Sequence, residues 1–107
     1  MIYLASPYSH PDLQVMEFRY EQACLMTGKL MKEGRVVYSP IVHNHPVAIR
    51  TSLPKGWEFW QKFDLELLGL ASQLYVFTLD GWLTSTGVKA EVERARELSL
   101  VIKYVTL

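Results

Sequence analysis

The feature that most constrains the fold is an alternation, along the whole chain, of short apolar segments with longer segments of helical periodicity. The strand-like segments are residues 2–5, 36–38, 73–79 and 100–105. The helical patterns cover residues 12–33, 57–70 and 87–98. This alternation is typical of a parallel sheet covered by helices, joined by right-handed crossovers. We therefore predict a single α/β domain over residues 1–107, a flavodoxin- or Rossmann-like, doubly wound, three-layer fold with a sheet of about four strands.

One stretch interrupts the alternation. Residues 43–56 contain Pro46, Pro54 and Gly56, which are residues that end or break helices and strands. We predict an irregular loop here, between the second strand and the second helix.

Charge and cysteine content narrow the function classes. Eleven basic residues balance eleven acidic ones, so no net field favours nucleic acid or an anionic membrane, and a small-molecule ligand is expected. Cys24 is the single cysteine, which excludes an internal disulfide and fits a reducing cytosol. Residues 1–5 are apolar but much shorter than a signal peptide or a membrane span. We expect a cytoplasmic protein.

The predicted topology also places a ligand site. In doubly wound sheets, ligands bind outside the carboxyl ends of the strands, so the loops after Ala5, Tyr38 and Leu79 should line one crevice. These loops are rich in polar residues and glycine, although surface loops are polar in general. The candidate binding residues are Ser6, Ser9, His45, Asp80, Trp82, Ser85 and Gly87.

Two acidic residues lie on the wrong faces of their predicted helices. Glu91 follows Val88 by three positions and precedes Ala95 by four, so it lies at the edge of an apolar stripe. Asp64 falls within the apolar arc of the 57–70 helix. A buried acid costs several kcal/mol unless it is paired, neutralised or facing a cavity. Either acid alone has a structural explanation, a backbone amide for Glu91 or an ion pair with Arg19 for Asp64; together they indicate a polar pocket.

Paired carboxylates suit glycosyl transfer, in which one attacks the anomeric carbon and another group orients the sugar or handles the proton of the leaving group. His43 and His45 form a His-x-His pair that raises the question of a metal. No third ligand is spaced nearby, and the chemistry needs neither metal nor cofactor.

The residues around these acids resemble the nucleoside 2-deoxyribosyltransferase superfamily and the related deoxynucleoside 5′-monophosphate N-glycosidases. Ser85-x-Gly87-Val88-x-x-Glu91, after an Asp80-Gly81-Trp82 turn, is similar to the segment that carries their catalytic glutamate. The first strand, from Ile2 to Pro7, resembles theirs, and Asp64 resembles their sugar-site aspartate. Gly81-Trp82-x-x-Ser85 and His45-Pro46 are similar to a small branch of that superfamily.

The resemblance implies roles for individual residues. Glu91 would be the nucleophile that attacks C1′, Tyr3 would hold it, and Asp64 would bond the sugar or protonate the departing base. Ser85 would contact a 5′-phosphate. The resemblance also implies a homo-oligomer, and it leaves hydrolysis and transfer both open.

Several alternatives remain open at the level of sequence. Ser85 is also an ordinary helix N-cap, and Trp82, the best candidate for stacking on a base, is of a residue type that more often packs in cores. The helix starts near Ser6 and Ser9 and near Ser85 would suit a phosphate. Fold does not determine function, so a non-catalytic nucleotide-binding or sensing module is the alternative to an enzyme.

Overall fold

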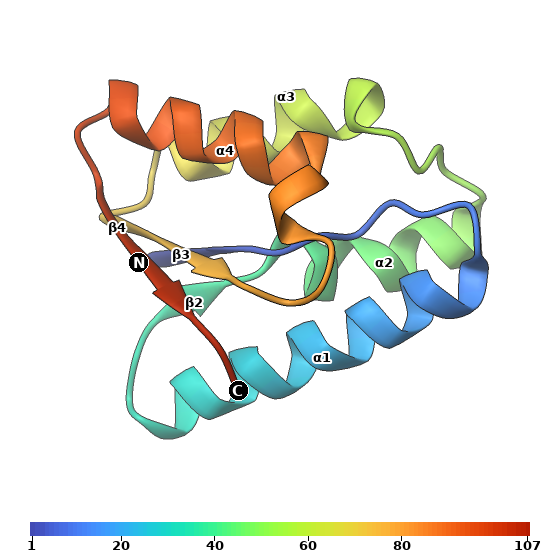
Figure 1. Cartoon of the computed structure of the whole chain (residues 1–107), viewed down its shortest axis with the longest axis horizontal. Coiled ribbons are helices and arrows are strands. Elements are labelled where there is room, and N and C mark those ends of the chain that lie inside the picture. Colours follow the sequence, from blue (N-terminus) through green and yellow to red (C-terminus); the bar gives the residue numbers. More distant parts are fainter.

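The computed structural model describes all 107 residues and contains a parallel sheet with the strand order β2-β1-β3-β4. The strands are β1 (Ile2–Ala5), β2 (Val37–Tyr38), β3 (Gln73–Phe77) and β4 (Val101–Val105). The helices are α1 (Leu13–Lys32), α2 (Pro40–Thr51), α3 (Trp57–Leu68) and α4 (Thr86–Glu97), with a short 3₁₀ helix, η1 (Trp82–Thr84). Figure 1 shows their arrangement. The predicted α/β fold with a four-stranded parallel sheet is confirmed.

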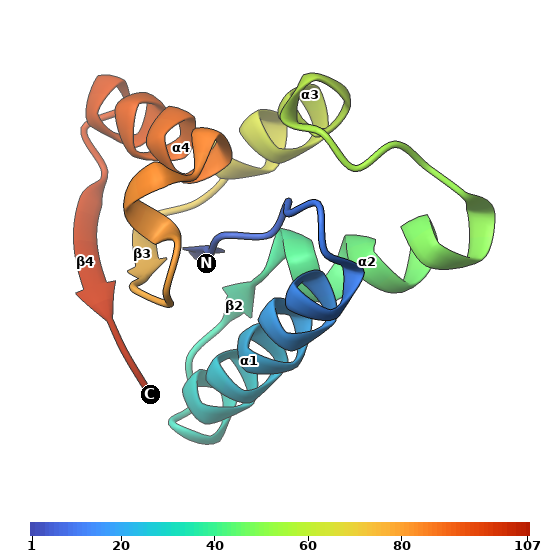
Figure 2. The same cartoon turned by 45° about the vertical axis from the view of Figure 1, so that its right-hand side comes forward.

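The sheet is buried between two layers of helices because its apolar side chains point alternately to opposite faces. Ile2, Leu4, Tyr75 and Phe77 pack with Met26 and Leu30 of α1. Tyr3, Ala5, Leu74 and Val76 pack on the other face, with Leu68 of α3 and with Val88 and Ala95 of α4. Figure 2 shows α1 on one side of the sheet and α3 and α4 on the other. The predicted three-layer arrangement is therefore present.

The order of the strands determines where a ligand can bind. The chain leaves β1 toward β2 on one side, and the later strands β3 and β4 lie on the other side of β1. The crossovers on either side of this point cover opposite faces, which opens a crevice at the carboxyl ends of β1 and β3. The three loops that follow β1, β2 and β3 all reach this edge of the sheet.

Helix α1 is the longest element and is amphipathic. Asp12 caps its start by accepting a hydrogen bond from the backbone N–H of Gln14, 2.8 Å away, and Gly34 follows its end with a φ of 81°. Met16, Ala23 and Leu30 are buried, whereas Met31 is exposed. No helix in the molecule is both long and apolar enough to cross a membrane.

The predicted loop over residues 43–56 is wrong, because helix α2 occupies most of it. Ser39 caps this helix by accepting a hydrogen bond from the N–H of Val42, and Pro40 occupies the first turn, where its missing N–H is not needed. Pro46 lies inside the helix and leaves the carbonyl of Val42 without its usual donor. Packing of α2 against α1, with Ala48 buried, offsets that loss.

Candidate functional site

A cavity of about 460 Å³ lies at the carboxyl ends of the strands, where the topology places the crevice. Its walls come from the loop after β1, from α2, from the start of α3, and from the turn after β3 with the first two turns of α4. Seven of the residues predicted from sequence line it: Ser6, Ser9, His45, Asp64, Ser85, Gly87 and Glu91. The cavity thus collects residues from across the chain into one polar site.

Glu91 is the most deeply buried acid of the site. It lies in the second turn of α4 and is 3 % exposed, as its position on the apolar stripe predicted. The hydroxyl of Tyr3, which points from β1 toward α4, donates a hydrogen bond to the Glu91 carboxylate. A side chain from the central strand therefore holds Glu91, and no backbone amide takes this place.

Burial dominates the electrostatics of Glu91. Burial, against the lowering effect of the hydrogen bond from Tyr3 and with an added contribution from the negative charge of Asp64, raises the pKa of Glu91 to about 8. Burial and the same two carboxylates also raise the pKa of Tyr3 well above its usual value. Tyr3 therefore stays protonated and acts as a hydrogen-bond donor.

Asp64 is the second buried acid, 8 % exposed, and it points from α3 into the same cavity. Burial raises the pKa of Asp64 to about 7, against the lowering effect of a hydrogen bond from Asn44 Nδ2 at 3.4 Å. The alternative of an ion pair with Arg19 is not realised, because Arg19 donates to the backbone carbonyls of Tyr8 and Ser9. Asp64 and Glu91 therefore face one cavity, and the negative charge of Asp64 contributes to the raised pKa of Glu91.

The start of α4 forms another wall. Ser85 Oγ accepts a hydrogen bond from the N–H of Val88 at 3.2 Å, so the N-capping role weighed from the sequence is present. Ser85 also lines the cavity, beside Thr86 and Gly87. A Cβ on Gly87 would lie 3.2 Å from the ring of Trp57, so the two residues pack closely at this wall.

The two serines of the loop after β1 differ. Ser6 is buried, and its hydroxyl has no hydrogen-bond partner within the protein, although it lines the cavity. A buried hydroxyl without a partner is unfavourable unless a ligand or a water molecule forms a hydrogen bond with it. Ser9 is exposed and donates to the carbonyl of Lys55 at 2.6 Å. Ser6 is therefore the better placed of the two to bind a ligand.

Three predicted site residues do not line the cavity: Tyr3, which is bonded to Glu91, and Asp80 and Trp82. Asp80 is exposed in the turn after β3, and Trp82 belongs to η1, where its ring packs 5.6 Å from that of Tyr104. Trp82, predicted to stack on a base, packs its ring against the core and does not line the cavity. Gly81 lines the cavity in their place, with a φ of 99°. The guanidinium of Arg19 lies where a Cβ on Gly81 would be.

His45 and His43 do not converge on one point. His45 is buried between Tyr8 and Glu17, whereas His43 is exposed and lies 2.7 Å from Asn44 Oδ1. Residues two apart on a helix point in nearly opposite directions, which explains why this His-x-His pair forms no shared site.

The predicted site left out several lining residues, among them Tyr8, Arg19, Asn44 and Trp57. Tyr8 lies between Ser6 and Ser9, in a segment already assigned to the crevice, so its position carried a usable signal. Asn44 lies in the segment wrongly predicted to be a loop. Arg19 and Trp57 reach the cavity only through tertiary packing.

A comparison with protein-family models matches residues 1–104 to a family described as Domain of unknown function (DUF1937). No curated protein matches the chain. The matched range contains every residue that lines the cavity.

Proposed function

The chain belongs to the DUF1937 family, and from the chemistry of its cavity we propose that it is an N-glycosidase or deoxyribosyltransferase acting on a nucleoside or a nucleoside 5′-monophosphate. The observation that carries the proposal is the buried Glu91, bonded to Tyr3 and coupled electrostatically to Asp64 in one cavity. Two acids with raised pKa values in a cleft are typical of acid–base and nucleophilic sites. The resemblance to the nucleoside 2-deoxyribosyltransferases supports the same assignment.

The proposed reaction has two steps. Ionised Glu91 attacks C1′ and forms a glycosyl ester while the C1′–N bond breaks, and protonated Asp64 gives its proton to the departing base. In the second step, water or another base attacks C1′, releases Glu91 and returns a proton to Asp64. One proton shared between the two carboxyl groups is enough for both steps. Because the pKa of Glu91 is about 8 and that of Asp64 about 7, this proton lies mainly on Glu91 in the free protein and passes to Asp64 before the attack.

The direct test is base release. Purified protein is incubated with deoxynucleosides and their 5′-monophosphates, free base is measured by chromatography, and acid-quenched protein is examined by mass spectrometry for a glycosyl adduct on the Glu91 peptide. Ligands that raise the melting temperature, with no base release and with unchanged affinity in Glu91→Gln, would instead establish a non-catalytic nucleotide-binding or sensing module.

We expect Ser85→Ala to lower the affinity for a nucleoside 5′-monophosphate roughly ten-fold or more and to leave the affinity for the matched nucleoside almost unchanged. The hydroxyl and the free N–H groups at the start of α4 would bond the phosphate, and charge-assisted bonds contribute about 1.5 to 3 kcal/mol each. Affinities are measured by calorimetry. Ser39→Ala removes the equivalent cap of α2, outside the cavity, and serves as the control. If both ligands lost affinity equally, Ser85 would act only as a helix cap and would not bind the phosphate.

We also expect the chain to self-associate, most simply as a homodimer. Phe18 and Leu25 lie seven residues apart on one face of α1 and are 55 % and 58 % exposed. Large exposed apolar patches are rare on monomers. Sedimentation at micromolar concentration should show a dimer that Phe18→Glu converts to monomer. A wild-type protein that sediments only as a monomer contradicts this expectation.

A further inference from the structure

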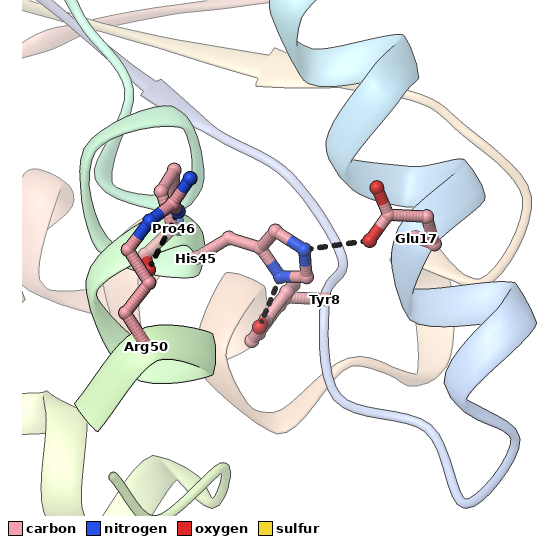
Figure 3. Close-up of polar contacts among 5 residues, drawn as sticks. All are labelled: Tyr8, Glu17, His45, Pro46 and Arg50. Atoms are coloured by element: carbon pink, nitrogen blue, oxygen red, sulfur yellow. Dashed lines mark hydrogen bonds and ion pairs between the residues drawn. The ribbon is translucent and has the colours of Figure 1, made fainter. Parts of the chain in front are cut away.

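A chain of hydrogen bonds runs from the cavity to the surface of α1 and takes no part in the reaction above. His45, 5 % exposed in α2, has its Nδ1 atom 2.6 Å from the hydroxyl of Tyr8 and its Nε2 atom 2.8 Å from a carboxylate oxygen of Glu17. Figure 3 shows the imidazole between these two partners. The ring of Tyr20 stacks on it, with 4.3 Å between centroids. The imidazole is therefore held in one orientation.

The partners determine where the protons lie. An ionised carboxylate can only accept a hydrogen bond, so the Nε2 atom of His45 carries a proton and donates it to Glu17. A neutral imidazole carries one proton, which leaves Nδ1 as an acceptor for the hydroxyl of Tyr8. The only hydrogen of that hydroxyl is then used inside the protein. Tyr8, which lines the cavity, offers a ligand only the lone pairs of its oxygen.

Tyr8 enters the cavity from the loop after β1, whereas Asp64 and Glu91 enter it from α3 and α4. Burial and Glu17 raise the pKa of Tyr8 to about 12, so its hydroxyl keeps its proton. In the proposed reaction C1′ lies at Glu91, and the 5′ group lies at the start of α4. The remaining part of the substrate, the base, would then face the wall formed by Tyr8 and α2.

We propose that Tyr8 is a specificity-determining residue that accepts a hydrogen bond from an exocyclic amino group of the base, with its polarity set by His45 and Glu17. This inference rests on the proposed function and names its substrate class, nucleotides of amino-bearing bases such as adenine and cytosine. The deaminated counterparts, hypoxanthine and uracil, present a carbonyl oxygen at the same position. Two acceptors then face each other, and both lose the hydrogen bonds they make in water.

The test compares matched substrates that differ only in this group, dAMP with dIMP and dCMP with dUMP. Dissociation constants are measured by calorimetry with Glu91→Gln, which prevents turnover, and base-release rates are measured with protein carrying Glu91. The amino member of each pair should bind at least about ten-fold more tightly than the oxo member, because only the amino group can form the hydrogen bond with Tyr8. Adding Tyr8→Phe should weaken binding of the amino members about ten-fold and leave binding of the oxo members unchanged.

Glu17→Gln tests the positioning role of the relay. Glutamine has the shape of glutamate but can donate as well as accept, so it no longer imposes one tautomer on His45. The preference for amino members should shrink, although Glu17 itself lies on α1 and does not line the cavity. Glu21→Gln, an exposed change one turn further along α1, should leave the preference intact. Nitrogen NMR of His45 should show a protonated Nε2 and an unprotonated Nδ1 with Glu17 present.

The outcomes separate the two proposals. Equal binding of amino and oxo members, equal weakening of both by Tyr8→Phe, or a proton on Nδ1 in the NMR spectrum would overturn the role of Tyr8, and base release would still stand. Neither binding nor base release with any of the four nucleotides or their nucleosides would overturn the proposed function, and this inference with it.

Discussion

Glu91→Ala is expected to lower the rate of base release by about 10⁴-fold or more, the scale seen when a nucleophile is removed from a preorganised site. The variant lacks the atom that would bond C1′, and Asp64 and Tyr3 cannot replace it from their positions on α3 and β1. Base release is measured under single-turnover conditions on the best substrate found. The glycosyl adduct should disappear from the mass spectrum together with activity.

Two controls make this result specific to the carboxylate. Glu93→Ala removes an exposed acid two residues further along α4 and should keep full activity. Circular dichroism should show that the Glu91 variant is folded, since the change removes a buried ionisable group. Wild-type turnover by a folded Glu91→Ala protein would disprove the assignment of the nucleophile.

Glu91→Gln is expected to raise the free energy of unfolding at alkaline pH by a few kcal/mol. Burial raises the pKa of Glu91 from 4.5 to about 8, so the native state binds more protons than the unfolded state between these values. Stability gained from this group is therefore present at low pH and is lost as pH rises through about 8. At about 1.4 kcal/mol per pKa unit the loss reaches at most about 5 kcal/mol, and glutamine, which never ionises, avoids it.

The measurement is urea unfolding of both proteins from pH 5 to pH 9. The stability difference between Glu91→Gln and wild type should be small at pH 5, grow up to about pH 8 and level off toward pH 9. Glu93→Gln, an exposed change on the same helix, should give a curve parallel to wild type. If the free energy of unfolding of Glu91→Gln also ran parallel to that of wild type across this pH range, ionisation of Glu91 would not destabilise the fold, and the prediction would be wrong. A gain in stability with loss of activity is typical of a site strained for function.

Local sequence patterns determined most of the architecture. The segments assigned to strands and to three of the four helices agree with the structure to within two residues at each end, because hydrophobic periodicity and helix-ending glycines act over short distances. The same periodicity singled out Glu91 and Asp64 as acids on apolar faces, and both are buried. Their burial could be predicted because the direction of a helical side chain follows from its position along the helix.

Only the tertiary structure decided the remaining features. Helix α2 survives Pro46 because it packs on α1, a contact that no local propensity encodes. The ring of Trp82 turns toward Tyr104 rather than the cavity, since the 3₁₀ turn sets its direction. His45 gains both of its partners, Tyr8 and Glu17, from positions 37 and 28 residues away. Hydrogen bonds and raised pKa values depend on distances and burial in space, and these quantities exist only once the chain has folded.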